Sequence, residues 1–148
     1  MNPPSIEPAE PVERTVPTRR ELIWQRRALA IVVAVVVNVI ILGIGRLANG
    51  DLPIAKVGSD AQTIGVALVI GVTALVGILA WVLLDVLERT MTHSRARMIW
   101  TAVAVVVFLL SLLGPLGSAQ NTYSRVLLVC MHIGAAATII PLMRQSRR

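Results

Sequence analysis

The chain has 148 residues, of which 55% are hydrophobic, 15% charged and 3% aromatic, and its formal net charge is +6. A soluble domain of this length has too small a core to enclose so much apolar surface, and disordered chains are poor in Val, Ile and Leu. The composition therefore excludes both classes and favours an integral membrane protein. The basic residues flank long uncharged runs without interleaved aromatics, which argues against a nucleic-acid partner.

The first 17 residues contain five prolines and three glutamates, a composition typical of a solvated segment. We expect residues 1–17 to form a disordered cytoplasmic tail, followed by a four-helix transmembrane domain over residues 18–148. Thr18 and Glu21 have the spacing of a capping box, which predicts a helix start. The favoured interpretation is that this helix is the first turn of the first span; the alternative is a separate amphipathic helix on the membrane surface.

Four runs of 18, 24, 27 and 18 residues contain no Asp, Glu, Lys or Arg. About 20 apolar residues cross the hydrocarbon layer as a helix, which satisfies its own backbone groups in lipid. The sequence therefore predicts an all-α fold, an up-and-down bundle of four transmembrane helices. The expected spans are residues 28–45, 62–84, 98–114 and 126–143.

The third run is too long for one straight span, and Gly114-Pro115 interrupts it. Proline lacks the N–H donor and disfavours helix in the residue before it. We expect the helix to end near Leu113 and a short outer loop to cover residues 117–124. A kinked helix that continues to about Ser118 is the alternative.

The basic residues are distributed unevenly about these spans. Eleven Lys and Arg residues lie in the two terminal segments and in the loop between spans two and three, against three on the other side. The positive-inside bias then places both termini of this multi-pass protein in the cytoplasm. Trp24, Trp81 and Trp100 fall at the inner ends of three spans, where tryptophan favours the headgroup layer, and we expect them to be interface anchors.

Asn38 and His132 are polar residues near the middle of spans one and four. They lie 8 and 7 residues from Arg46 and Arg125 at the outer ends, which is about 11–12 Å of helix and places them at matching depth. A bare amide or imidazole is costly in hydrocarbon, so each needs a partner. The favoured interpretation is structural, with bonds to each other, to a backbone carbonyl or to water. The alternative is a proton- or substrate-handling site.

The second span ends in a charged segment and contains small residues at helical spacing. Asp85 and Arg89 are spaced i,i+4 and favour an ion pair on one helix face, which together with Glu88 is interpreted as a solvated helix end. The small-xxx-small motifs allow close helix approach and are expected to pack within the bundle. They are Ala67 with Gly71, Thr73 with Gly77 and Gly134 with Thr138.

Several short segments together resemble a known family. These are Asn38 with Gly45-Arg46, Trp81 with Leu87-Glu88-Arg89, the segment 111–116, and Met131-His132 before Ile140-Pro141. They are similar to a family of small four-span membrane proteins from actinobacteria that has no assigned function, over about residues 25–143. The resemblance implies a bacterial plasma-membrane location and carries over no catalytic residue.

No catalytic or cofactor-binding motif is present in the sequence: HExxH, CxxC, GxSxG and the P-loop are all missing. We therefore expect no enzyme activity, no cofactor and no metal site. The favoured function is that of a structural, accessory or interaction component, whose partners are the lipid bilayer and a second copy or another membrane protein. The alternative is a small transporter or channel subunit that uses the intramembrane pair Asn38 and His132.

Overall fold

The computed structural model describes residues 18–49, 53–57, 60–63, 65–118 and 122–145. The described chain consists of helices and one short hairpin. In chain order its elements are α1 (Arg19–Asn49), β1 (Pro53–Val57), β2 (Asp60–Thr63), α2 (Val66–Thr90), α3 (His93–Ser111), α4 (Leu113–Ser118) and α5 (Thr122–Gln145). The predicted disordered tail lies outside the described residues.

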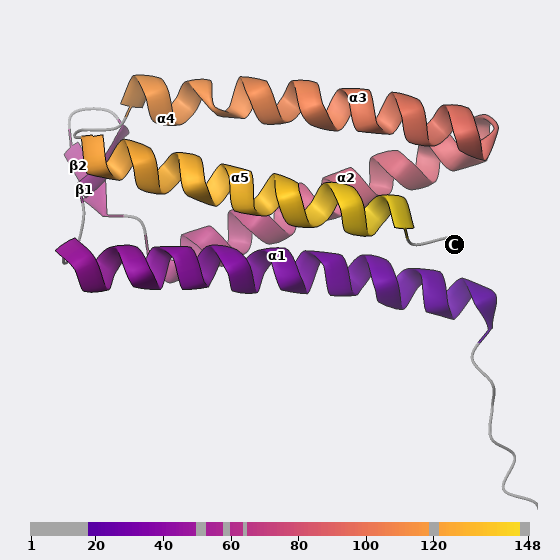
Figure 1. Ribbon diagram of the computed structural model, residues 1–148, viewed down its shortest axis with the longest axis horizontal. Coiled ribbons are helices and arrows are strands. Elements are labelled where there is room, and N and C mark those ends of the chain that lie inside the picture. The colour runs from indigo at the N-terminus through magenta and orange to yellow at the C-terminus, as the bar shows by residue number, and fades with distance from the viewer. Residues whose placement is uncertain (1–17, 50–52, 58–59, 64, 119–121, 146–148) are drawn as a thin grey trace, which may run out of the picture.

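Four segments are long and apolar enough to cross a membrane, namely Glu21–Ala48, Val66–Thr90, His93–Gly117 and Thr122–Gln145. They alternate in direction, so that α1 begins and α5 ends at the same end of the bundle (Figure 1). We call this the terminal end, and the opposite end, where β1 and β2 lie, the hairpin end. The predicted bundle of four membrane-spanning helices is confirmed.

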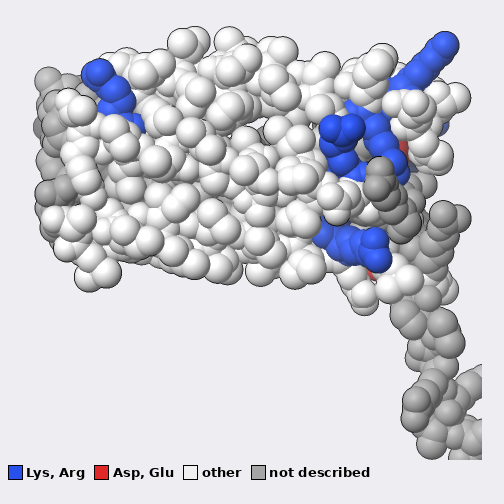
Figure 2. Space-filling view, in the orientation of Figure 1, with Lys and Arg blue, Asp and Glu red and all other residues white. Residues whose placement is uncertain are grey.

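Charged side chains gather at the two ends of the bundle and leave an uncharged band between them (Figure 2). Such a band matches the hydrocarbon layer, which charged groups avoid, and the charged ends match the two headgroup layers. The arginines at the terminal end include Arg26, Arg27, Arg89, Arg95, Arg97 and Arg144, and those at the hairpin end include Arg46 and Arg125.

The helix α1 begins at the predicted capping box. The Thr18 N–H donates to Glu21 Oε2 at 2.7 Å, and the Glu21 N–H donates to Thr18 Oγ1 at 3.4 Å. From there α1 continues for 31 residues as one helix. The interpretation of this start as the first turn of span one is confirmed, and the separate surface helix is wrong.

The second span begins later than its charge-free run. The strands β1 and β2 pair antiparallel, with Val57 opposite Asp60, and β2 includes residues 61–63. The helix α2 begins at Val66, four residues beyond the predicted start at 62. A run without charged residues shows which residues can lie in lipid. It does not show at which residue the hairpin ends and the helix begins.

The third span is a kinked helix. The Leu112 N–H bonds both Phe108 O and Leu109 O, at 3.2 and 3.3 Å, which tightens this turn. Pro115 lacks the N–H that would bond to the Ser111 carbonyl in a regular helix. The helix is therefore interrupted at this turn and resumes as α4.

The kinked alternative for this segment is confirmed, and the predicted loop over 117–124 is wrong. Gly117 and Ser118 belong to α4, and Thr122 already begins α5. Residues 119–121 lie outside the described residues. The proline interrupts one turn but does not end the span. In lipid no water is present to hydrogen-bond carbonyls that lack a helical partner, so the chain forms helix again after the proline.

The helix α1 packs against α2 and α5 along most of its length. The buried apolar residues form two clusters, one in each half of the bundle. Towards the terminal end they are Ala30, Ile31, Ala34, Leu84, Trp100, Ile139 and Met143; towards the hairpin end they are Leu42, Val69, Leu127 and Met131. Between the clusters lie Asn38 and Thr73, so the bundle has a polar contact at its middle.

Candidate functional site

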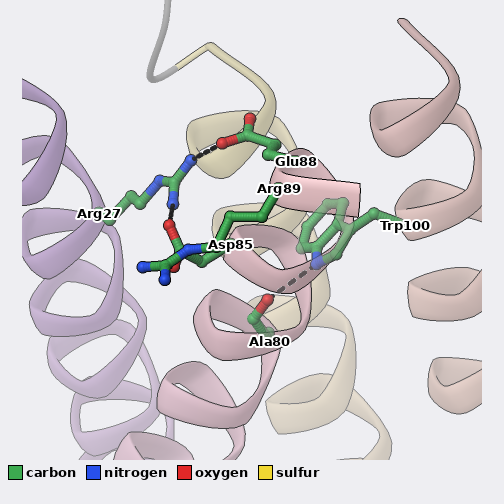
Figure 3. Close-up of polar contacts among 6 residues, drawn as sticks. All are labelled: Arg27, Ala80, Asp85, Glu88, Arg89 and Trp100. Carbon is green, nitrogen blue, oxygen red and sulfur yellow. Dashed lines mark hydrogen bonds and ion pairs between the residues drawn. The ribbon is translucent and has the colours of Figure 1, made fainter. Parts of the chain in front are cut away.

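An ion-pair cluster connects α1 and α2 at the terminal end (Figure 3). Arg27 Nη2 lies 2.7 Å from Glu88 Oε2, and Arg27 Nη1 lies 3.7 Å from Asp85 Oδ1. The Arg27 side chain is 1% exposed and that of Glu88 is 4% exposed. Charges buried to this degree require a partner. The cluster therefore joins α1 to α2 at this end of the bundle.

The predicted pair within α2 is also present. Arg89 Nη2 lies 2.6 Å from Asp85 Oδ2, and the Arg89 side chain is 70% exposed. Asp85 thus joins Arg27 and Arg89 (Figure 3). The i,i+4 pair is confirmed. The interpretation of the whole segment as a solvated helix end is wrong for Glu88, which faces the bundle and not water.

The three tryptophans all lie at the terminal end, but in different environments. The rings of Trp24 and Trp81 meet edge to face, with centroids 4.9 Å apart, and Trp24 is 53% exposed. Trp100 is 1% exposed, and its Nε1–H donates to the Ala80 carbonyl at 2.8 Å (Figure 3). In this structure Trp100 joins α3 to α2; the role of all three as membrane-interface anchors stays a prediction.

Asn38 bonds a residue that the sequence did not suggest as its partner. Its Nδ2 donates to Thr73 Oγ1 on α2 at 3.0 Å, and both side chains are buried. Its Oδ1 is buried and has no hydrogen-bond partner among the described residues. This oxygen lies near Gly134 on α5, where a Cβ added to the glycine would be 3.5 Å from it. Asn38 therefore joins α1 to α2 and lies against α5.

His132 bonds to its own helix. Its Nδ1 lies 2.8 Å from the Leu128 carbonyl oxygen, and since a carbonyl only accepts, Nδ1 carries the proton in this contact. A neutral ring then has Nε2 as an acceptor. Asn38 and His132 are not bonded to each other. Of the partners predicted for the structural interpretation, the backbone carbonyl is the one that His132 takes.

A cavity of about 330 Å³ nevertheless brings these two residues together. Asn38, Thr73 and His132 line it together with apolar side chains from α2, α3 and α5, among them Phe108 and Ile139. The cavity lies beside the middle of α3, at the depth that the sequence predicted for both polar residues. Its lining is mostly apolar with a few hydrogen-bonding groups, a composition common in sites for small apolar ligands.

Glycine sets the close approach of α1 to its neighbours. A Cβ added at Gly134 would lie 2.9 Å from Ile41 Cδ1, and one added at Gly77 would lie 2.9 Å from Ile31 Cγ1. At Gly71 nothing lies within 4 Å of such an atom. The motifs at Gly77 and Gly134 therefore pack within the bundle as predicted, whereas Gly71 faces outwards.

Hydroxyl groups in the spans bond to carbonyls of their own helices, and three of these groups lie away from the span ends. Thr101 donates to Arg97 O, Ser111 to Phe108 O and Thr138 to Gly134 O. This is the usual way in which Ser and Thr are satisfied in a helix without water. Among the described residues no group of three or more His, Cys, Asp or Glu side chains is placed to hold a metal ion.

Four apolar helices, with an uncharged band between the two charged ends of the bundle, are the features of a multi-pass helical membrane protein. The family of unknown function DUF6069 matches residues 18–148, so the chain belongs to DUF6069. No curated protein and no solved structure matches the chain. The predicted membership of a four-span family without assigned activity is confirmed, and the actinobacterial origin stays a prediction.

Sequence reasoning missed the partners of the polar residues. It found Asp85 and Glu88 but not Arg27, and it found Asn38 but not Thr73. One signal was present: Arg27, Ala34 and Asn38 recur at intervals of 7 and 4 residues, so they share one face of a helix. If Asn38 points into the bundle, Arg27 on the same face of the helix therefore points into it too.

Proposed function

We propose that the protein is a structural or accessory component of a plasma-membrane assembly, with both termini in the cytoplasm and no enzyme activity. One observation carries this proposal: the buried polar side chains Arg27, Asn38 and Trp100 each bond a neighbouring helix. Groups used in this way hold helices together. The outward faces of the helices are apolar and available to lipid and to other membrane helices.

The distribution of charge supports the cytoplasmic placement of the termini. Eleven of the fourteen Lys and Arg residues belong to the terminal segments and to the loop between spans two and three, and positively charged segments stay in the cytoplasm. Reporters fused separately to the two ends of the full chain test this. Activity of both reporters inside the cell is expected; activity of either one outside would overturn the placement.

The small-residue strip of Ala67 and Gly71 on α2 supports contact with a partner helix. Both residues are exposed, and space is open at Gly71. Small residues let helix backbones approach closely in lipid. The partner in this proposal is either a second copy of the chain or another membrane protein.

Mild solubilisation of the tagged protein from its native membrane tests this association. We expect a complex of fixed mass in light scattering. Gly71→Leu should lower the fraction of the protein found in this complex several-fold. Gly43→Leu is the matched control, because a Cβ at Gly43 on α1 also meets nothing within 4 Å. A wild-type protein that elutes as a monomer, or equal loss in both variants, would contradict the accessory role.

A transporter or channel subunit is the second candidate, and the shared cavity of Asn38 and His132 is the observation that favours it. Flux of protons and small solutes into vesicles that contain the purified chain distinguishes the two candidates. The accessory role predicts flux no greater than that of empty vesicles. Flux that is lost in Asn38→Ala and His132→Ala, while both variants stay folded, would establish the second candidate instead.

A further inference from the structure

A second hollow lies at the terminal end, between the start of α3 and the end of α5, and Ile23 of α1 also lines it. We call it the basic groove. It has a volume of about 1450 Å³ and is open to the outside, well above the 300–1000 Å³ common for small-molecule pockets. Its rim is polar, with His93, Ser94, Arg97 and Arg144. It shares none of its lining residues with the cavity of Asn38 and His132.

The two arginines of the groove differ from those of the ion-pair cluster. Within the described part of the chain, neither Arg97 nor Arg144 has an ion-pair partner. The carboxylates described at this end are engaged elsewhere: Glu21 accepts from the Thr18 N–H, and Asp85 and Glu88 pair with Arg27 and Arg89. Two guanidinium groups on one groove, with no acidic side chain among its lining residues, are complementary to an anion.

The amino end of α3 adds positive character at the same place. Its N-cap residue, Thr92, makes no side-chain hydrogen bond to the first turn. The first amide N–H groups of a helix have no partner within the helix and carry partial positive charge. His93 and Ser94, the first residues of this turn, lie on the rim of the groove.

The depth of the groove matches the boundary between headgroups and hydrocarbon. Arg97 directly precedes the charge-free run 98–124, and Arg144 directly follows the run 126–143. Below the rim the groove continues over Met98, Val105 and Val106 of α3. From Arg97 to Val106 is about 13 Å along the helix, so one side of the groove is polar at headgroup depth and apolar at acyl-chain depth.

We propose that the basic groove binds an anionic phospholipid, with its phosphate on Arg97 and Arg144 and an acyl chain over Met98, Val105 and Val106. A guanidinium group matches phosphate in both charge and geometry. Basic pockets between membrane helices recognise anionic headgroups in the same way. A free phosphate ion would use the two arginines but would leave the apolar floor of the groove empty.

Native mass spectrometry of the full chain tests the headgroup contact. The protein is released from nanodiscs that contain equal amounts of phosphatidylglycerol and phosphatidylcholine, and retained lipid is counted. We expect retention of phosphatidylglycerol over phosphatidylcholine, reduced about fivefold by Arg97→Gln or Arg144→Gln and about 25-fold by both. Arg26→Gln with Arg95→Gln is the charge-matched control, because both arginines lie at the same end outside the groove, and it should change the preference less than twofold.

A second pair of variants tests the acyl chain. Val106→Trp fills the apolar floor without changing any charge, and we expect it to lower retention of phosphatidylglycerol about fivefold. Val103→Trp makes the same change on a residue of α3 that does not line the groove, and it should retain lipid like the wild type. The two variants keep the test decisive if an arginine variant fails to fold.

Three results would overturn the proposal. Equal retention of the two lipids would show that the groove does not select charge. Equal loss in the control double variant would show attraction by the whole charged surface. Full displacement of phosphatidylglycerol by millimolar inorganic phosphate, with no effect of Val106→Trp, would identify a soluble anion as the occupant.

Discussion

Two helices of this bundle have similar apolar sequences but pack very differently. The helix α1 has buried residues along its length, at Arg27, Ala34, Asn38 and Leu42 among others. Of the residues of α3, all of which the structure describes, Ala96 and Trp100 are the buried ones. Both helices are rich in Val and Ala. The residues that distinguish their packing are therefore the polar and small ones.

The third span is held at its two ends and open in its middle. After Trp100 its next buried residue is Pro115 in α4. The cavity of Asn38 and His132 lies beside this stretch, and the basic groove lies on α3 nearer its start. Apolar helices gain little from contact with one another in lipid, because lipid tails are equally apolar. Small residues and hydrogen bonds decide the contact, and the middle of α3 offers few of either.

The largest effect is expected at the buried ion pair between α1 and α2. Glu88→Gln removes the near carboxylate from Arg27, and because breaking a buried pair leaves a charge without its counter-ion, we expect a loss of about 3 kcal/mol in the free energy of unfolding. Arg89→Gln breaks only an exposed pair and should cost less than about 1 kcal/mol. Unfolding in mixed detergent micelles measures both. Equal costs would show that the cluster does not hold the α1–α2 contact.

The close contact of α1 with α5 should be nearly as sensitive. Gly134→Val forces side-chain atoms into Ile41 and Val37, and we expect a loss of about 2 kcal/mol, as for other overpacked interiors. Gly43→Val is the matched control, since a Cβ there meets nothing within 4 Å. Melting temperatures in the same detergent compare the two variants. A fold that tolerates Gly134→Val as well as Gly43→Val would contradict the tight α1–α5 contact.

Trp100 attaches α3 to α2 through a side-chain hydrogen bond to the Ala80 carbonyl. Trp100→Phe keeps an aromatic ring but removes the N–H donor to the Ala80 carbonyl, so we expect a loss of about 1 kcal/mol. Trp24→Phe keeps an aromatic ring for the edge-to-face contact with Trp81 and should have a smaller effect. The same unfolding assay applies. If Trp100→Phe were neutral, packing alone would hold α3, and the contrast between the two helices would be smaller than the structure indicates.

The smallest effect is expected at the middle of the bundle. Asn38→Ala and Thr73→Val each remove one side of the hydrogen bond between α1 and α2, and bonds of this type contribute about 0.6 kcal/mol in membranes. A double-mutant cycle measures their coupling. Additive losses would mean that the two side chains do not stabilise each other.

The spans were predictable because lipid leaves the backbone few choices. A charge-free run of sufficient length forms a helix, and this rule located four spans and their alternation. The capping box at Thr18 and the i,i+4 pair of Asp85 and Arg89 were also predictable, because both depend on residues within one turn. Features that depend on local spacing are visible in the sequence.

The contacts between helices were not predictable in the same way. Asn38 required a partner, but matching depth pointed to His132, whereas the bond goes to Thr73. Depth along the membrane follows from residue counting; the rotation of one helix against another does not. The start of α2 was missed, and the kink before α4 was only the alternative prediction, for a related reason: hydropathy alone does not place turns.

The packing contrast is tested most directly by spin-label distances in the full chain, reconstituted in nanodiscs with Cys130 replaced by Ser. One label at Ile133 on α5 is paired in turn with a label at Ile40 on α1 and at Leu109 on α3, all three exposed and within the charge-free runs of their spans. We predict a narrow distribution from α5 to α1 and a clearly broader one from α5 to α3. Equally narrow distributions would contradict the account of a tight contact on one side of α5 and an open one on the other.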